Sequence, residues 1–348
     1  MRNPVIDDSH SQVFRQNTGW FAVRLAMLVL LLAPLDRAVA DQQWATRDAA
    51  LMGTRISVTV AGVPAETANA AIDAVLAEIS RIEQLMSTYI DESAISAINR
   101  DAHRGPVAAG AELYGLIEQS LAFSRMSDGA FDITYDSVGQ HYDFRAGKRP
   151  DDATTERERV RIGYNQLSLN PDDYSIAFSH EGVRINLGGI AKGYAVEQAV
   201  GVLARFGVRH AMISAGGDTR LVGDRLGQPW IVGIQNPRAD DSVAVRLGLA
   251  DEAISTSGDY ERYFEADGVR YHHIVSPQSG RPAEGVRSAS VIGPNGVWTD
   301  ALSTTVFVLG VEAGLALIDS LADYEAVIVD ERQRLHYSHG LAAGDVAE

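Results

Sequence analysis

The sequence contains no cysteine, and this absence excludes several kinds of chemistry. Without thiols the chain has no disulfide bond, no thiolate ligand for a metal and no cysteine nucleophile. It also lacks the cysteine that carries the lipid of a lipoprotein, so we expect no lipid anchor of that kind.

Basic residues are scarce as well. The 348 residues include 30 Lys and Arg against 46 Asp and Glu, which gives a formal net charge of −16, and no stretch is rich in Lys or Arg. A basic groove that follows a nucleic-acid backbone is therefore not expected, and neither is a nucleic-acid partner. A protein this acidic needs a metal ion or oriented backbone amides to bind an anionic ligand.

Long hydrophobic runs are also rare. One apolar run, from Leu25 to Leu35, follows several arginines and precedes "RAVA" and Asp41. A charged segment, a short apolar run and an A-x-A pattern are typical of a secretory signal peptide, here residues 1–40. The run is shorter than the roughly 20 residues of a membrane-spanning helix, although an uncleaved anchor remains the alternative. We therefore expect an exported, periplasmic protein, soluble or loosely associated with the inner membrane.

The rest is ordinary globular sequence, 46% hydrophobic and 22% charged, with clear local periodicity. The predicted elements are, in order, a strand at 54–60, a helix after Pro64 up to Met86, a helix at about 111–126, a strand at 183–187, a glycine turn followed by a helix, a strand at 210–217, and hairpins at 263–275 and 325–338. Helices and hairpins in this order indicate an α+β fold with largely antiparallel sheets packed against helices.

The most polar stretch after the leader, residues 145–161, has no apolar periodicity. We expect a surface segment there and a seam between two subdomains. The predicted domain covers residues 41–341, and residues 342–348 form a C-terminal tail.

Two pairs of adjacent glycines follow predicted strands, in "NLGGIAKGYA" (186–195) and in "SAGGDTRLVG" (214–223). The first stretch matches neither a P-loop nor a dinucleotide-binding fingerprint. Glycines let a backbone approach a ligand closely, but tight turns need them equally. The residues alone therefore leave a ligand site and two unrelated turns as alternatives.

One carboxylate and two hydroxyls share a face of the helix predicted in "WTDALSTTVFVLG" (298–310). Asp300 lies three residues before Ser303 and four before Thr304, which is helical spacing. Hard oxygen ligands of this kind suit Mg²⁺. The alternative is that Thr299 or Asp300 only caps the helix.

His272 and His273 end a hairpin strand, where adjacent side chains face opposite sides. Only one of them can serve a given site, and a strand histidine is more often structural than a general base. Tyr89 and Phe131 stand at segment ends, where core packing is a stronger interpretation than stacking on a planar ring.

Eight stretches, taken in order, closely resemble the ApbE family of FAD:protein FMN transferases: "MGTRISV", "MSTYIDESAISAIN", "GAFDIT", "NLGGIAKGYAV", "SAGGD", "ISTSGDYERYF", "HHIVSPQSGRP" and "TDALSTTVFVLG". The resemblance covers the chain from Met52 to about Leu341. It implies an α+β fold of two subdomains with an FAD site between them, and an exported Mg²⁺-dependent enzyme. FMN passes from FAD to a threonine hydroxyl of a target protein through a phosphoester, and AMP leaves. Targets are membrane redox subunits, such as those of sodium-pumping NADH:quinone reductase and related complexes.

The resemblance also implies roles for individual residues. FAD would be contacted by Met52, Tyr89, Ala130, Phe131, Asp132, Asn186, Lys192 and His273. The Mg²⁺ ligands would be the main-chain oxygen of Gly189 and the side chains of Asp300, Ser303 and Thr304. Asp300 and His273 would be the catalytic residues, with His273 as the candidate for deprotonating the threonine.

Two residues depart from the family pattern, in which Asp is usual at the positions of Asn186 and Ser276. Each departure removes one carboxylate near a polyanionic ligand, which affects rate or substrate choice more than the fold. Two further functions stay open. One is an FAD pyrophosphatase, in which water replaces threonine, and the other is a non-catalytic flavin carrier.

Overall fold

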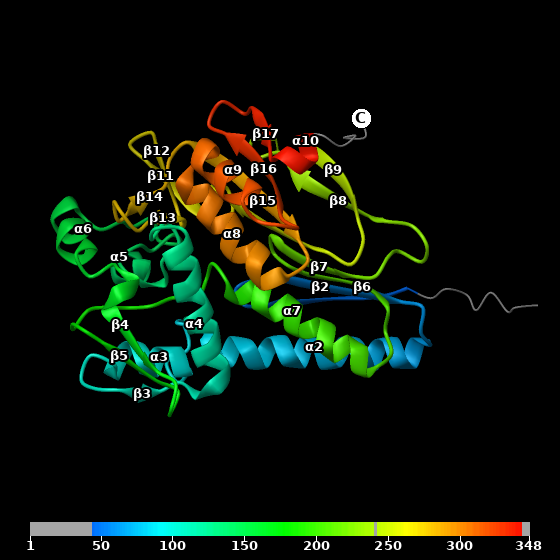
Figure 1. Ribbon diagram of the computed structural model, residues 1–348, viewed down its shortest axis with the longest axis horizontal. Helices are drawn as coiled ribbons and strands as arrows, with labels where there is room; N and C mark the ends of the chain where they lie inside the picture. The colour runs from blue at the N-terminus through cyan, green and yellow to red at the C-terminus, as the bar shows by residue number, and fades with distance from the viewer. Residues whose placement is uncertain (1–43, 240–241, 343–348) are drawn as a thin grey trace, which may run out of the picture. The chain divides into compact units, whose positions relative to one another are not determined.

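A computed structural model describes residues 44–239 and 242–342, which belong to one compact unit (Figure 1). The predicted signal peptide lies outside these residues, as does nearly all of the predicted tail. Within the described ranges no helix combines the length and the apolar character that a bilayer crossing requires.

An eight-stranded sheet organises the chain, and every neighbouring pair in it is antiparallel. Its strands, in spatial order, are β1 (Ala45–Leu51), β2 (Thr54–Ala61), β6 (His210–Ala215), β7 (Asp218–Val222), β10 (Ala253–Gly258), β15 (Val286–Gly293), β16 (Glu325–Asp330) and β17 (Leu335–Tyr337). The alternating pattern of β2 buries Ile56, Val58 and Val60 on one face, as period-two spacing predicts.

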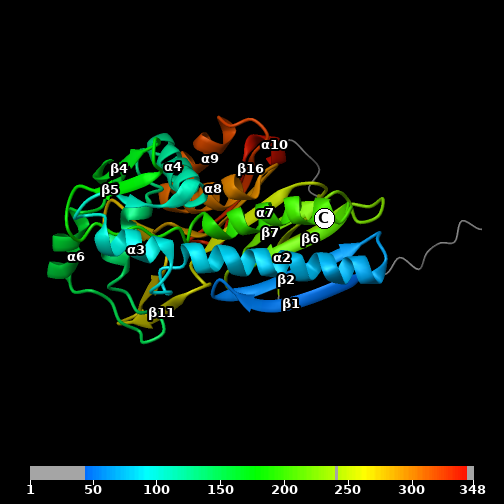
Figure 2. The same ribbon diagram turned by 90° about the horizontal axis from the view of Figure 1, so that it is seen from below.

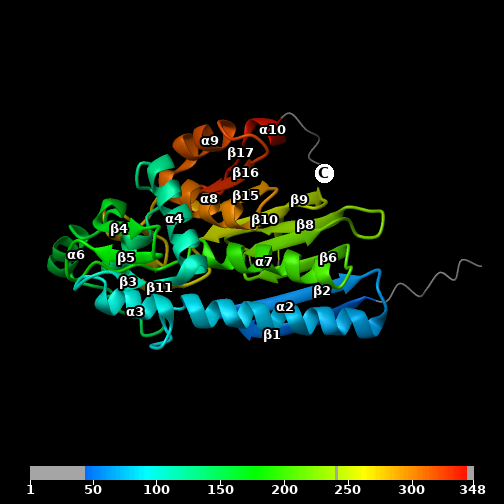
Figure 3. The same cartoon turned by 60° about the horizontal axis from the view of Figure 1, so that its bottom comes forward.

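Four helices cover one face of this sheet and follow one another in sheet order (Figure 3). They are α2 (Ala65–Met86) over β1 and β2, α7 (Ala191–Arg205) over β6 and β7, α8 (Gly296–Leu309) over β10 and β15, and α9 (Val311–Asp319) over β16. The short helix α10 (His339–Ala342) also contacts β16. Figure 2 shows α2 lying along the β1–β2 hairpin.

The apolar stripe of α2 explains why this segment is helical. Ile72, Val75, Ile79 and Ile82 recur three or four residues apart and are fully buried. Burial of each such side chain contributes about 1.5–3 kcal/mol to folding.

A hairpin packs on the opposite face of the sheet. It consists of β8 (Trp230–Gln235) and β9 (Val243–Leu249), and its Trp230 and Ile234 share a small core with Leu221 and Ile254 of the sheet. The sheet is therefore covered on both faces at β7 and β10, the strands that carry site residues.

The remaining elements form smaller units. They are α3 (Ala94–Asp101), β3 (Val107–Ala108), α4 (Gly110–Met126), η1 (Ile133–Tyr135), α5 (Asp136–Gly139), α6 (Asp152–Arg159), η2 (Tyr164–Gln166), β4 (Leu167–Asn170), β5 (Ser175–Phe178), β11 (Tyr263–Ala266), β12 (Val269–His272), β13 (Val275–Ser276) and β14 (Arg281–Pro282). Strands β3, β5 and β4 make a three-stranded sheet, while β11 with β12 and β13 with β14 make hairpins. Helix α6 lies within the polar stretch 145–161, and the subdomain seam proposed there stays a prediction.

Most predicted elements are confirmed, but the strand predicted at 183–187 is wrong. That segment runs through the structure without pairing to another strand. Its backbone is bonded by other groups: the Ile185 N–H donates to Asn99 Oδ1 (2.8 Å), and Asn99 Nδ2 donates to the Ile185 carbonyl (2.9 Å). Asn186 N–H donates to the Ile133 carbonyl of η1 at 2.9 Å. The apolar alternation of this segment therefore belongs to an unpaired extended stretch, which the side chain of Asn99 and the turn η1 hold in place.

Candidate active site

The site begins where helices α7 and α8 touch. A Cβ on Gly193 would lie 2.1 Å from the Gly296 carbonyl oxygen and 2.5 Å from Asp300 Cβ, so only glycine allows this approach. The Gly193 N–H lies in the first turn of α7, where an N–H has no acceptor within the helix. It donates instead to Asp300 Oδ2 at 2.8 Å. This contact fixes the carboxylate of α8 against the start of α7.

Two buried carboxylates face one ammonium at this contact. Lys192 Nζ lies 2.8 Å from Asp218 Oδ2 and 3.6 Å from Asp300 Oδ1. Asp218 and Asp300 are each only 2% exposed. When both carboxylates are ionised, the trio carries one net negative charge in a largely buried place, an arrangement that attracts a cation.

The ionisation of these groups reflects both burial and their neighbours. Burial, followed by the negative charge of Asp218, raises the pKa of Asp300 to about 7. Burial opposes the charge of Lys192, but the two carboxylates outweigh it and raise its pKa above the usual range. The ammonium therefore stays protonated, while the carboxyl group of Asp300 titrates near neutral pH. Asp218 Oδ2 accepts no properly oriented hydrogen bond from the described residues, despite its 2.8 Å ion pair.

A strand and a helix bring hydroxyls to the same place. Ser257 Oγ on β10 lies 2.9 Å from Ser303 Oγ and 3.1 Å from Thr304 Oγ1, both on α8. Two residues earlier on the strand, Ser255 Oγ lies 2.9 Å from Thr299 Oγ1. Residues two apart on a strand and four apart on a helix share one side, so the two periods match across this interface.

The predicted alternative, that Thr299 or Asp300 caps helix α8, is wrong. Asn295 is the cap, and its side-chain oxygen accepts the N–H groups of Val297 (3.0 Å) and Trp298 (3.2 Å). Asp300 stands one turn inside the helix, so its burial serves another purpose.

The oxygen ligands proposed for the metal lie together. A Cβ on Gly189 would be 3.2 Å from Thr304 Oγ1, which places the Gly189 backbone beside the hydroxyls. No three His, Asp or Glu side chains within 44–239 and 242–342 are grouped as a complete metal cage. Mg²⁺ typically uses one or two carboxylates and keeps waters or substrate phosphates as its other ligands. Asp300, the two hydroxyls and the Gly189 carbonyl fit that requirement.

The two adjacent histidines lie in different surroundings, as the strand pattern predicts. His272 is buried, its Nε2 lies 2.9 Å from the Ala283 carbonyl, and its ring meets Phe307 edge-on. His273 is half-buried, and its N–H donates to the Arg262 carbonyl at 3.1 Å. His272 therefore packs in the core, and His273, the less buried of the two, is the candidate for chemistry.

The ring of His273 is kept neutral. Burial, then the positive charges of Arg262 and Lys192, lower its pKa to about 3. Its Nδ1 is buried without a hydrogen-bond partner among the described residues. A neutral histidine with an unpaired nitrogen can accept a proton or a hydrogen bond from a ligand.

The residues proposed to contact the flavin differ in exposure. Tyr89 is 85% exposed, so the interpretation of this ring as core packing is wrong. Phe131 is 3% exposed and packs against Phe123, as core packing predicts, which leaves only its backbone for a ligand. Ala130 beside it is 3% exposed. Asp132 is used locally, because its Oδ1 accepts the Thr134 N–H (2.9 Å) and hydroxyl (2.6 Å).

Met52 occupies the turn between β1 and β2, with a positive φ of 51°, and its N–H donates to Glu83 Oε1 at 2.7 Å. The next residue in the turn, Gly53, accepts a hydrogen bond from Arg262 Nη2 at 3.3 Å through its carbonyl. Arg262 also accepts the backbone N–H of His273, so it connects this turn to His273. Ser276, the second departure from the family pattern, donates from Oγ to Gln278 Oε1 at 3.0 Å and so stabilises its own loop.

Asn186 lies at the centre of a polar network. Its Oδ1 accepts the Gly188 N–H at 2.8 Å, and its Nδ2 donates to Thr88 Oγ1 (3.3 Å) and to Asp136 Oδ1 (3.2 Å). Asp136 in turn accepts from Arg184 Nε at 2.6 Å. The contact with Thr88 places Asn186 next to the segment that carries Tyr89.

The sequence-based reasoning missed four residues of this site. They are Asp136, Asp218, Ser257 and Arg262. Asp218 had a local signal, because it directly follows the second glycine pair. Ser257 had a weaker signal: Ser255 and Ser257 are two residues apart on β10, and their partners Thr299 and Ser303 are four residues apart on α8. No local pattern identifies Asp136 or Arg262, whose partners lie far away in the sequence.

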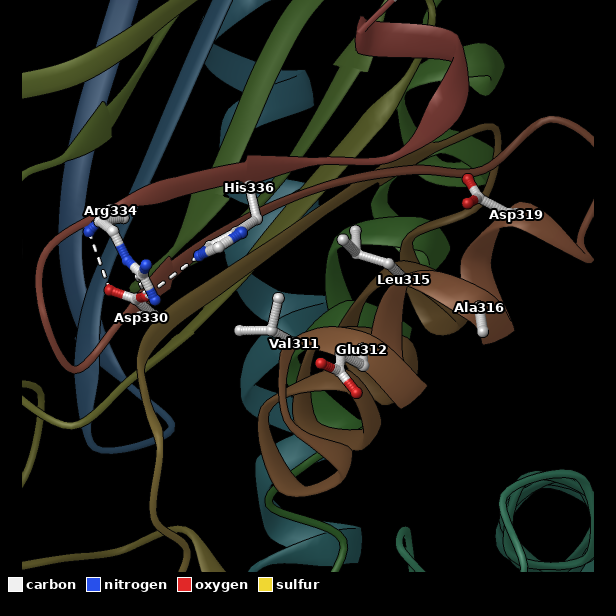
Figure 4. A pocket seen from close by; sticks show the side chains of 8 residues that line it. All are labelled: Val311, Glu312, Leu315, Ala316, Asp319, Asp330, Arg334 and His336. Carbon is white, nitrogen blue, oxygen red and sulfur yellow. Dashed lines mark hydrogen bonds and ion pairs between the residues drawn. The ribbon is translucent and has the colours of Figure 1, made fainter.

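Two open depressions of the described surface lie elsewhere. One of about 570 Å³ lies between α9 and the β16–β17 hairpin, where Asp330 binds Arg334 and His336 (Figure 4). A second of about 570 Å³ lies beside the β1–β2 turn and is lined by residues that include Glu83 and Arg145. None of the candidate catalytic or metal-binding residues lines either depression.

Comparison with known proteins identifies relatives over most of the chain. The sequence profile of the ApbE family matches residues 52–328. A Treponema pallidum protein named FAD:protein FMN transferase is 31% identical, over 80% of this chain and 82% of its own length. A protein of the same name from Vibrio cholerae is also 31% identical, over 77% and 82%. The crystal structure of the ApbE protein from Thermotoga maritima matches with a TM-score of 0.80 at 32% identity, covering 86% of this chain and 98% of that one.

Proposed function

The chain belongs to the ApbE family, and from this premise we propose that it is an FAD:protein FMN transferase. It moves the FMN part of FAD to a threonine hydroxyl of a target protein, through a phosphoester, and releases AMP. The observation that carries the proposal is the buried set of Asp218, Lys192 and Asp300 beside Ser303 and Thr304.

This set supports a Mg²⁺ requirement. Asp300, Ser303, Thr304 and the Gly189 carbonyl would hold the ion, which would supply positive charge to neutralise the phosphate oxygens. Lys192 balances part of the carboxylate charge, and Gly193 keeps Asp300 oriented through its N–H. Phosphoryl transfer needs alignment and charge neutralisation more than covalent help from the protein, and these residues supply both.

His273 supplies the acid–base function. Its neutral ring can take the proton from the threonine hydroxyl as that oxygen bonds to the FMN phosphorus and the bond to the AMP oxygen breaks. General base catalysis of this kind typically contributes about 10²- to 10⁴-fold. With a pKa of about 3 in the free protein, the ring is a weak base. The negative charges of bound FAD act in the opposite direction to Arg262 and Lys192 and make the ring more basic when it is needed.

One incubation separates this function from its two rivals. The purified protein is mixed with FAD, Mg²⁺ and a flavin-accepting domain of a redox subunit, once with its threonine and once with valine in its place. AMP release with covalent fluorescence on the threonine form alone indicates the transferase. AMP release with either acceptor and no labelling indicates the pyrophosphatase, and FAD binding without AMP indicates the carrier. An Asp300→Ala variant should release no AMP, and full activity of this variant with excess Mg²⁺ would overturn the metal assignment.

We also propose that the protein acts after export, on a membrane redox subunit such as that of sodium-pumping NADH:quinone reductase. The apolar run and "RAVA" before Asp41 support export. Mass spectrometry of the protein recovered from the periplasm tests this, because a processed chain begins near Asp41. Recovery of the intact chain from the cytoplasm would contradict it.

A further inference from the structure

We propose that Asp136 is a positioning residue that fixes the side-chain amide of Asn186 so that only its oxygen is available to bound FAD. The inference rests on the proposed function for the identity of the ligand. It assigns a role to a buried carboxylate that is not among the proposed metal ligands.

The surroundings of Asn186 determine which way its amide points. The Gly188 N–H on one side requires an acceptor, and the Asp136 carboxylate on the other requires a donor. A flipped amide would set its oxygen against Asp136 Oδ1 and its N–H against the Gly188 N–H. Both hydrogen bonds would be replaced by repulsive contacts, so one orientation is strongly preferred.

This orientation leaves one group for a ligand. The two N–H bonds of Asn186 are directed to Thr88 and Asp136, while Oδ1 accepts a single bond, from Gly188. A carbonyl oxygen has two lone pairs, so Oδ1 can accept one more hydrogen bond. Asn186 is half-buried and keeps access to solvent. Toward FAD it therefore acts as an acceptor for a hydroxyl or N–H of the nucleotide, the role that a carboxylate at this position would have.

Asp136 is suited to this role because it is itself immobilised. It is 5% exposed, begins α5, and accepts from Arg184 Nε at 2.6 Å. Burial raises its pKa and the Arg184 charge opposes that effect. A second carboxylate at position 186 would lie about as close to Asp136 as the present 3.2 Å contact and would repel it. In this chain the carboxylate is at Asp136, on the side of Asn186 away from the proposed ligand, and the uncharged Asn186 faces the ligand.

The same network reaches the metal ligands. Asn186 holds Gly188, and the next residue, Gly189, lies beside Thr304. A loose Asn186 would therefore weaken FAD binding and also shift the main-chain oxygen offered to the ion.

A swap of the two residues tests the proposal. In Asp136→Asn, the side-chain oxygen of residue 136 still accepts from Arg184, so its NH₂ group faces the NH₂ group of Asn186. Two donors then face each other, and the amide of Asn186 should flip. Asn186→Asp places two carboxylates together. Each single variant should bind FAD about tenfold more weakly, the value of one hydrogen bond to a charged or well-oriented group. The double variant D136N/N186D restores a donor at 136 and an acceptor at 186, and its affinity should return to within about threefold of the wild type.

The readouts keep the role in binding apart from folding and from transfer. FAD dissociation constants are measured by flavin fluorescence without an acceptor protein, and thermal unfolding is recorded for each variant. Asn170→Asp, a matched charge change at an exposed site on β4, should leave FAD affinity unchanged. The inference is overturned if the double variant loses FAD affinity by a factor equal to the product of the factors lost in the two single variants. If the wild type binds FAD but labels no acceptor, the transferase proposal fails while the swap result still stands. If the wild type does not bind FAD, both proposals are overturned.

Discussion

Replacing Gly193 by alanine tests how closely α7 and α8 must approach for the site to form. The new methyl group would lie 2.1 Å from the Gly296 carbonyl oxygen and 2.5 Å from Asp300 Cβ. Favourable carbon contacts lie at about 3.5–4.0 Å, so the helices would have to move apart by more than about 1 Å. Neither clashing atom is the end of a flexible side chain, and the strain cannot be relieved by a rotamer change.

The energetic cost follows from three contributions. Overpacking costs about 1–3 kcal/mol, loss of the Gly193 N–H bond to the Asp300 carboxylate costs about 1.5–3 kcal/mol, and the better helix propensity of alanine returns about 1 kcal/mol. Together these give an expected fall of about 1.5–5 kcal/mol in the free energy of unfolding. The displaced Asp300 should also raise the Mg²⁺ concentration needed for half-maximal AMP release.

A matched control lies on the same helix. Gly201 is in α7, exposed, and a Cβ added there meets nothing within 4 Å. Gly201→Ala should therefore stabilise the protein by up to about 1 kcal/mol through helix propensity alone. Urea unfolding followed by tryptophan fluorescence compares the two variants directly. If Gly193→Ala unfolds at the same or a higher urea concentration than Gly201→Ala, the close contact of the two helices does not exist.

Three other perturbations address the charges of the protein. Lys192→Met leaves Asp218 and Asp300 without their ammonium and should lower the free energy of unfolding by about 3–5 kcal/mol at pH 8. The raised pKa of Asp300 lets a proton replace the lost charge, so the defect should shrink at pH 5, and added Mg²⁺ should also reduce it. An equal defect at both pH values in urea unfolding would refute this. Burial raises the pKa of Asp330, but hydrogen bonds from Arg334, His336 and Arg332 outweigh burial and hold the pKa below its usual range. The ionised Asp330 therefore stabilises the folded protein fully above about pH 4, and this stabilisation disappears as the pH falls further. Asp330→Asn should therefore unfold more readily than the wild type at pH 7, with the difference narrowing toward pH 3, and a constant difference would contradict the ion pairing. Finally, NMR titration of the free protein should show no protonation of His273 between pH 5 and 8, because burial and the charges of Arg262 and Lys192 lower its pKa to about 3. A midpoint near 6.5 would show that neither burial nor these charges lower the pKa.

Local periodicity was enough to predict elements whose partners are close in sequence or whose faces are simple. Helix α2 has one apolar stripe, and the β11–β12 hairpin has Asp267 and Gly268 in its turn, both with positive φ. The segment 183–187 misled the same reasoning, because its apolar alternation reports burial rather than strand pairing. Its partner Asn99 is 86 residues away and leaves no local pattern.

The site could be predicted only in part, for the same reason. Asp300, Ser303 and Thr304 share one helix face, so their spacing alone brings them together. Asp218 and Ser257 join them through sheet neighbours that the sequence does not reveal. Burial was the least predictable property, since Tyr89 is exposed and Asp136 is buried, against the usual preference of each residue type.

The ammonium of Lys192 also bears on when the protein can fold. Small metal-binding domains whose ligands repel one another stay unfolded until the ion arrives. Here a cation belonging to the chain lies between the two carboxylates from the start, so the native state can form without a divalent ion. We therefore expect a chelator to stop catalysis but leave the protein folded. The supply of Mg²⁺ would then regulate the activity of molecules that are already assembled.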